Sequence, residues 1–230
     1  MYMQKKLETK DIPNRKKVLK PWGSEYKIYS NSILSIKLLR IHKNQSTSLH
    51  CHPVKKTGFI LIKGTVEVDL GFYNKKNLSA PTKLMIRPGL FHATKNNINE
   101  TSVILEIETP IDKDDLVRFK DSYGRENKSY EGKKYLEELS KDDLIFDEPK
   151  VNQIKKYNLE NMIVTIEKTN NIKNLKNRNK KAIFAILDGG LKSNNNLLVL
   201  SPGDIVGSDT LNKLCEVFKI HKYITILSVV

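Results

Sequence analysis

The sequence contains few cysteines and no long apolar run. Cys51 and Cys215 are the only cysteines among 230 residues, so disulfides are not expected to hold the fold together. No run of about 18 apolar residues is present, which argues against a membrane partner. The N-terminal residues MYMQKKLETKDIPNRKK lack the apolar core of a secretory signal. We therefore expect a soluble globular protein with a cytoplasmic location.

Arginine is also scarce, although the formal net charge is +14. Only six of the 40 basic residues are arginine, and the lysines occur as scattered pairs such as Lys75-Lys76 and Lys155-Lys156. No zinc-finger pattern, helix-turn-helix pattern or basic patch with interleaved aromatic residues accompanies them. The composition predicts no nucleic-acid partner, and the positive charge favours small anionic substrates instead.

Short β-type runs separated by turn residues fill the sequence from Tyr26 to Glu108. In TVEVDL, apolar residues at 66, 68 and 70 alternate with polar ones, as in a strand with one buried face. Gly64, Gly71 and Pro88-Gly89 mark corners between runs. Many short strands at regular spacing predict a jelly roll, a sandwich or a barrel.

A second β-rich region begins near residue 151, after a charged stretch. Within that stretch GKKYLEELS looks helical, and Leu116, Val117 and Phe119 are expected to anchor the stretch on the first barrel. FAILDGGLKS followed by LLVLSPGDIVG repeats the pattern of FILIKGTVEV followed by LMIRPGLFHAT, but without the histidines. The repeat predicts two copies of one β-fold, the second degenerate.

Histidine is rare, and three of the five histidines fall where one fold can bring them together. On a strand, His50 and His52 point to the same side, while Cys51 points away. His92 follows a Pro-Gly corner at the start of another expected strand. Three imidazoles from two strands can bind a divalent metal and leave other positions open. We predict a metal centre here; the alternative is a set of polar surface histidines.

The remaining histidines and cysteines lack this geometry. His42 and His221 are expected at the surface, Cys51 as a small packing residue, and Cys215 as a packed thiol rather than a nucleophile.

The histidine stretch resembles the cupins. Their first motif is Gly, five residues, His-x-His, three or four residues, Glu, six residues, Gly; their second is Pro-x-Gly, two residues, His, three residues, Asn. The corresponding positions hold Asn44, His50, His52, Thr57 and Gly64 in the first motif, and Arg87, Gly89, His92 and Asn96 in the second. The resemblance implies an all-β bicupin, with two jelly-roll barrels of which the second is degenerate. It also places Thr57 and Asn96 in the substrate pocket.

A closer resemblance involves KPWGSEYKI (20–28) and DDLVRFKDSYGR (114–125). They resemble the two ends of the C-terminal cupin domain of bifunctional mannose-1-phosphate guanylyltransferase/mannose-6-phosphate isomerases, over roughly residues 18 to 126. The resemblance implies a divalent metal ion (zinc, nickel, manganese or iron) and a sugar-phosphate or nucleotide-sugar substrate. The implied activity is most simply an aldose-ketose isomerase in surface polysaccharide synthesis, and the implied assembly a homodimer.

The expected organisation has four parts: an N-terminal arm (1–19), a metal-binding barrel (20–110), a charged connection with a short helix (111–150), and a degenerate second cupin (151–230).

The sequence departs from the cupin pattern at Thr57, where the family has an acid. An isomerase must polarise a carbonyl and move a proton, and threonine cannot serve as the base near pH 7. Lys55 and Glu106 are the predicted catalytic replacements. The Lys55 ammonium also suits a substrate phosphate, the role that we favour. For Glu106, in ILEIE, we favour an outward-facing position over one inside the barrel.

Two other functions stay open. Thr57 and the degenerate second half favour a non-catalytic carbohydrate-binding or regulatory bicupin. The three-histidine ligand set, taken alone, favours an iron dioxygenase.

Overall fold

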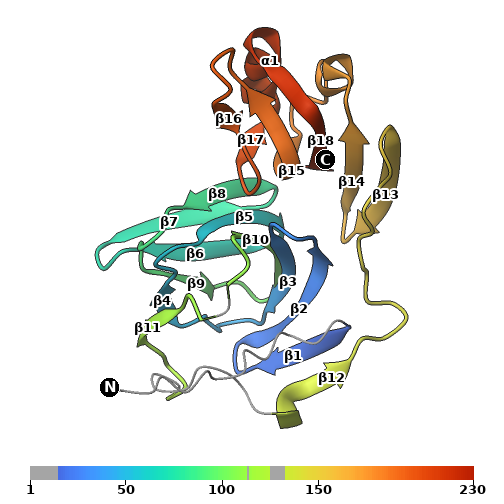
Figure 1. The fold of residues 1–230 in the computed structure, drawn as a ribbon. Helices are drawn as coiled ribbons and strands as arrows, with labels where there is room; N and C mark the ends of the chain where they lie inside the picture. The colour runs from blue at the N-terminus through green and yellow to red at the C-terminus, as the bar shows by residue number, and fades with distance from the viewer. Residues whose placement is uncertain (1–14, 113, 125–132) are drawn as a thin grey trace, which may run out of the picture.

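The computed structural model describes residues 15–112, 114–124 and 133–230. Most of the expected N-terminal arm and the start of GKKYLEELS, at Gly132, lie outside these ranges, as does Arg125 of the second quoted motif. The described residues are mostly strands and contain a single α-helix (Figure 1). The predicted all-β class is confirmed.

The first barrel consists of two antiparallel sheets. The large sheet has the strand order β12 (Leu136–Glu138), β1 (Lys16–Lys20), β2 (Gly23–Ser30), β3 (Ser35–Ile41), β10 (Ser102–Thr109), β5 (Lys56–Lys63) and β8 (Thr82–Ile86). The small sheet has the order β11 (Val117–Lys120), β4 (Leu49–Cys51), β9 (His92–Asn96), β6 (Thr65–Leu70) and β7 (Asn74–Ser79). From β3 to β10 the chain crosses repeatedly between the two sheets, which is the jelly-roll arrangement.

Two backbone positions explain motif residues at the barrel's corners. Asn44, at the place of the first cupin glycine, has a φ of 58°, in the left-handed region that asparagine tolerates better than most residues. Gly23, in the motif KPWG, has a φ of 145°, and a Cβ there would lie 1.9 Å from the carbonyl oxygen of Arg40. Only glycine allows β2 to approach β3 so closely at this point.

The two faces of the large sheet pack in different clusters, one inside the barrel and one outside it. On β10, Ile104 packs in the apolar cluster inside the barrel, whereas Val103, Leu105 and Ile107 belong to a second cluster outside it. Alternation along the strand places Glu106 and Glu108 on the inner face with Ile104. The inner face of this strand therefore carries the barrel's acids, and its outer face is apolar.

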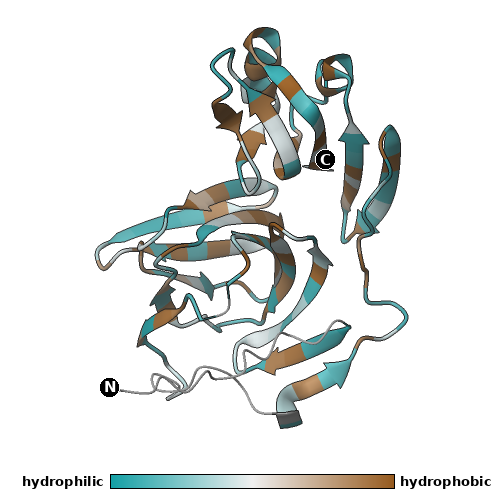
Figure 2. Ribbon diagram, viewed as in Figure 1, coloured by the Kyte–Doolittle hydropathy of each residue, from teal (hydrophilic) through white to brown (hydrophobic). Residues whose placement is uncertain are grey.

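The second region forms one further antiparallel sheet, the third sheet. Its strands are β13 (Gln153–Leu159), β14 (Met162–Thr169), β18 (Lys219–Val229), β15 (Ile183–Lys192) and β16 (Leu198–Leu200), with β17 (Ile205–Gly207) also paired to β15. Helix α1 (Ser208–Val217) and the 3-10 helix η2 (Ile172–Leu175) pack at one face. Figure 2 shows alternating hydrophobic and hydrophilic bands along these strands.

The third sheet packs on the outer face of the large sheet. One buried cluster contains Ile36, Leu105 and Ile107 from the barrel together with Ile166 and Leu227 from the third sheet. This apolar cluster crosses the boundary between the expected parts 20–110 and 151–230, whose limits remain a prediction. The described residues of the second region form one sheet rather than two, so the degenerate second cupin lacks a second sheet there.

Two local expectations were wrong. The run CEVFKI (215–220) belongs to the region that was expected to be β-rich, but Cys215 to Val217 end helix α1, whose buried Leu211 and Cys215 face the third sheet. GKKYLEELS was expected as a helix, but its described part is a 3-10 turn, η1 (Lys133–Tyr135), followed by β12, because β12 finds a partner in β1.

The connection contacts the barrel through one of the expected apolar side chains: the Phe119 ring lies 5.1 Å from the Phe72 ring and 5.8 Å from the Phe91 ring. Val117 and Phe119 are 48% and 59% exposed. Strand β11 is also held by backbone pairing with β4, with Val117 opposite Cys51 and Arg118 opposite His50. Strand pairing satisfies backbone groups whatever the side chains, so it holds β11 in place although Val117 is exposed.

Candidate metal centre

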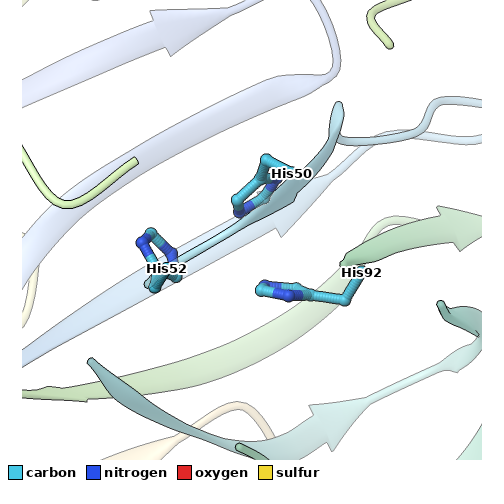
Figure 3. A group of neighbouring side chains, drawn as sticks. All are labelled: His50, His52 and His92. Carbon is cyan, nitrogen blue, oxygen red and sulfur yellow. The ribbon is translucent and has the colours of Figure 1, made fainter. Parts of the chain in front are cut away.

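Three histidines converge inside the barrel from two neighbouring strands of the small sheet. His50 on β4 lies directly opposite His92 on β9, and His52 follows β4 by one residue. The potential ligand atoms of the three imidazoles all lie within 4.8 Å of one another. Figure 3 shows the three rings pointing toward a common point. The predicted convergence of His50, His52 and His92 is thus present in the structure.

Each imidazole is oriented by a backbone carbonyl that accepts a hydrogen bond from Nδ1. The acceptors are the carbonyls of Ser48 (2.8 Å from His50), Asp115 (2.5 Å from His52) and Leu90 (3.0 Å from His92). Because a carbonyl only accepts, Nδ1 carries the proton and Nε2 presents its lone pair to the common point. Such outer hydrogen bonds are what fix metal-binding imidazoles.

The electrostatic surroundings keep these imidazoles neutral. Burial lowers the pKa of His50 well below its usual range, and the neighbouring His92 and His52 lower it further. Burial likewise lowers the pKa of His52, against the attraction of Glu108, and lowers the pKa of His92 to about 4. Neutral imidazole is the form that binds a metal, so all three are ready to bind near pH 7.

Unpaired buried atoms show that these residues fit a bound metal. Among the described residues, Thr57 Oγ1, His92 Nε2 and Glu108 Oε1 are the buried side-chain polar atoms without a hydrogen-bond partner. A buried polar atom normally has a partner, and an unpaired one calls for an unseen ion, water or ligand. His92 Nε2 belongs to the histidine cluster, and Glu108 Oε1 lies 3.4 Å from His52 Nε2.

A network of buried charges lies beside the histidines. Lys37 Nζ is 2.8 Å from Glu108 Oε2 and 3.5 Å from Glu106 Oε2, and Lys55 Nζ is 3.6 Å from Glu108 Oε2. Lys55, Glu106 and Glu108 are at most 6% exposed. Buried charges persist only when they are paired, and each acid here has a lysine partner.

The two acids of β10 differ in their protonation. Burial raises the pKa of Glu106, and the attraction of Lys37 only partly opposes it. Burial also raises the pKa of Glu108, but Lys37 and Lys55 together outweigh this effect and hold it below the usual range. Glu108 is therefore the firmly anionic member of the pair.

The positions of the predicted catalytic residues can now be stated. Lys55 lies in the buried network beside His52, and its role in catalysis stays a prediction. Glu106 points into the barrel, so the outward-facing position that we favoured was wrong: it lies opposite Phe59, an inner-core residue, and contacts Lys37. The alternation of ILEIE was read with the wrong face inward, because both faces of β10 are buried.

The two predicted pocket residues differ. Thr57 is 1% exposed and lies opposite Glu108 in the β5–β10 ladder, on the inner face of the barrel. Asn96 is fully buried, and its amide donates to the carbonyls of Ile41 and Glu100 and accepts from the Ile98 N–H. Asn96 is four residues along β9 from His92, which corresponds to about 13 Å. Its side chain therefore stabilises a turn and does not belong to the histidine cluster.

Asp115 was missed as a site residue, although it lies in the quoted motif DDLVRF. Its carbonyl orients His52, and its carboxylate accepts hydrogen bonds from the backbone N–H groups of Val54 and Lys55. The residue is 6% exposed. The resemblance to the family's tail motif was the available signal, but its role became visible only when the tail was placed beside β4.

The other histidines and cysteines lie as expected. His42 and His221 are exposed. Cys51 and Cys215 are buried free thiols, and burial raises the pKa of Cys215 to about 11, which suits a packed thiol.

The jelly roll and the inward-facing histidines together define a cupin. Within that class, the chain belongs to the family described as mannose-6-phosphate isomerase C-terminal, whose model matches residues 7–121. That match ends one residue after β11, so it contains the barrel strands β1 to β11, the three histidines and Asp115, but not β12.

Curated relatives match about half of the chain. The chain is 29% identical over 112 residues to the xanthan biosynthesis protein XanB from two strains of Xanthomonas campestris pv. campestris. The match covers 48% of this chain and 24% of that relative, so the chain spans about a quarter of the relative's length.

Solved structures resemble the chain only distantly. A double-stranded β-helix protein from Klebsiella pneumoniae shares 17% identity, with a TM-score of 0.39 over 42% of this chain and 85% of that chain. The capsular polysaccharide assembling protein CapF from Staphylococcus aureus shares 14% identity, with a TM-score of 0.41 over 46% of this chain and 34% of that chain.

The only α-helix in the described ranges, α1, is neither long nor apolar enough to cross a membrane.

Proposed function

We propose that the barrel binds a divalent metal through His50, His52 and His92 and acts on a sugar phosphate or nucleotide sugar in polysaccharide synthesis. The simplest reaction is an aldose-ketose isomerisation of the mannose-6-phosphate isomerase type. The observation that carries the proposal is the convergence of three neutral, carbonyl-oriented imidazoles in a chain of this family. The printed name of the XanB relative supports the link to polysaccharide synthesis.

The metal would supply polarisation of the sugar's carbonyl oxygen, and the chain's own residues would supply the rest. Lys55 is the proposed partner of the substrate's anionic group, because its ammonium lies beside the histidines on a flexible stem. Substrate phosphate would compete with Glu108 for this cation, which is 3.6 Å away in the structure.

Glu106 is the proposed proton carrier, and Thr57 is proposed to line the pocket. Burial raises the pKa of Glu106 to about 7, where a carboxyl group can both accept and return a proton near neutral pH. Proton shuttling through an enediol needs both steps from one group. Asn96 stays a pocket residue only as a sequence prediction.

A non-catalytic carbohydrate-binding barrel is the second candidate. Each of the two acids on β10 is paired with Lys37, and no acid follows the His-x-His motif at position 57. A site whose acids are occupied in this way can hold a sugar without moving a proton. The two candidates share the metal and differ only in turnover.

Turnover measured with the purified chain tests the proposal. Protein loaded separately with zinc, nickel, manganese or iron is incubated with mannose 6-phosphate, and fructose 6-phosphate is followed by a coupled assay. We expect turnover that disappears in the His50→Ala/His52→Ala variant. Binding of the sugar phosphate by calorimetry with no turnover under any metal would replace the isomerase with the second candidate; oxygen uptake with iron would indicate a dioxygenase.

A cytoplasmic location and a homodimer belong to the same proposal. Sedimentation analysis of the purified chain tests the dimer, and cell fractionation tests the location.

A further inference from the structure

The acid that the His-x-His motif lacks has a counterpart on the neighbouring strand. Thr57 on β5 lies directly opposite Glu108 on β10. In an antiparallel pair, residues directly opposite each other have Cβ atoms about 5 Å apart and point to the same face. A carboxylate on Glu108 can therefore reach the space that a longer side chain at Thr57 would have filled.

The contact with His52 has the spacing of two donor atoms on one ion. Glu108 Oε1 lies 3.4 Å from His52 Nε2, the nitrogen left available by the bond to Asp115. Two ligands bound at about 2.1 Å with a tetrahedral angle between them lie about 3.4 Å apart. The same oxygen is buried and has no hydrogen-bond partner, like Nε2 of His92.

The surrounding charges hold this carboxylate in the form that a metal binds. Its other oxygen, Oε2, contacts both Lys37 and Lys55, which keeps Glu108 anionic and fixes one end of the carboxylate. Oε1 is thereby left facing His52. The ligand atoms of the three histidines lie within 4.8 Å of one another, and no acid of the described residues joins this set. The Glu108 carboxylate therefore lies at the His52 side of the cluster and has to shift toward His50 and His92 to share an ion with them.

We propose that Glu108 is the fourth protein ligand of the metal centre and replaces, from the opposite strand, the acid that is missing at Thr57. The inference rests on the metal site of the proposed function but not on isomerisation. A firmly anionic carboxylate is a good ligand and a poor base, so the proton-carrier role is left to Glu106.

Metal binding without any sugar tests this assignment. Apo-protein is titrated with Co²⁺ and with Zn²⁺ by calorimetry, and the visible absorption of the Co²⁺ form reports the ligands. We expect Glu108→Gln to weaken binding about 10- to 100-fold and to change the Co²⁺ spectrum. Glu25→Gln is the matched control: it removes another buried acid of the large sheet, paired with Lys20 at 3.3 Å, and should bind like the parent.

A second variant separates ligation from simple charge attraction and serves if Glu108→Gln does not fold. Glu108→Asp keeps the charge beside Lys37 and Lys55 but withdraws the carboxylate by one methylene. A ligand role predicts weaker binding and a changed Co²⁺ spectrum; parent-like affinity and spectrum in this variant would overturn the assignment. So would parent protein that binds neither ion.

Restoring the acid at its usual place provides the complementary result. Adding Thr57→Glu to Glu108→Gln should return the affinity toward that of the parent, because a carboxylate again faces the histidines from the same site. A double variant that binds as weakly as Glu108→Gln would count against the shared position. Loss of sugar turnover with these metal results intact would reject the isomerase alone.

Discussion

The first barrel and the second region use their sheets in opposite ways. The large and small sheets of the barrel enclose an interior that carries histidines, lysines and acids. The third sheet encloses nothing: one face packs on the barrel and the other on helix α1, and both clusters are apolar. The comparison shows that a site requires part of an inner face to be free of core packing; the barrel interior has such a part beside its apolar cluster, and the second region lacks one.

The shared Pro-Gly corners make this contrast more informative. Gly89 and Gly203 have similar φ values of 73° and 85° and lead into β9 and β17. In the barrel, the corner precedes His92 at the start of β9 in the small sheet. In the second region, the corner precedes Ile205 at the start of β17, which stays in the third sheet, and Ile205 packs in the apolar cluster shared with the barrel. Similar corners therefore serve a site in one region and packing in the other.

The largest expected effect is the loss of metal binding by the barrel, with the fold unchanged. His50→Ala/His52→Ala should abolish retention of metal through dialysis, since two of three converging ligands are lost, while the circular dichroism spectrum stays unchanged. His42→Ala/His221→Ala removes two exposed histidines and should retain the parent's metal content. Equal metal content in both double variants would place the metal elsewhere.

The next largest effect is a loss of stability when the packing between the barrel and the second region is disrupted. Leu227→Ala on β18 truncates a fully buried side chain of the cluster shared with the barrel and should lower the free energy of unfolding by about 2–5 kcal/mol. Leu198→Ala on β16, at a site 48% exposed, should change it by less than about 0.5 kcal/mol. Urea unfolding measures both, and equal values would contradict the shared core.

Acid should destabilise the metal-free barrel through its buried histidines. Since the pKa of His92 is lowered from 6.5 to about 4, the unfolded chain binds this proton first, and the free energy of unfolding falls as the pH drops from about 6.5 to 4. His92 alone contributes about 3 kcal/mol across this window. His92→Gln should flatten the dependence in chelator-treated protein; an unchanged slope would show that His92 is not buried as a neutral group.

The smallest expected effect is a change in metal affinity when Asp115 of the connection is replaced. Asp115→Ala removes the acceptor for the N–H groups of Val54 and Lys55 and should lower metal affinity about 10-fold by loosening the loop after His52. Asp114→Ala, at an exposed neighbouring position, is the control and should bind like the parent. Calorimetric titration with Zn²⁺ compares them, and identical affinities would confine Asp115 to a packing role.

Most of the barrel was predictable because its strands alternate and its corners carry glycine. The histidines were predictable for the same reason: the i, i+2 spacing on β4 and the corner before β9 fix their faces. The acids on β10 were not, because both faces of that strand are buried and alternation alone cannot say which face is inside. Helix α1 was missed because CEVFKI combines helix-ending residues with the start of β18.

Glu108 was overlooked for a related reason. The sequence places it 51 positions after Thr57, and only the strand register brings the two together. Motif spacing is counted along the chain, whereas metal ligands must be close in space, here across two paired strands. The missing acid was therefore visible in the sequence, but its replacement was not.

Both faces of strand β10 are buried, and its outer face packs on the second region. This packing helps to fix the register of β10, and so the position of the acids on its inner face. A slip of one residue would turn Glu106 and Glu108 into the apolar contact with the third sheet and bring Leu105 and Ile107 toward the histidines. Packing on the outer face opposes that slip at every second residue. The third sheet thus helps to fix which side chains of β10 face the histidines, although it contributes none of its own to the cluster.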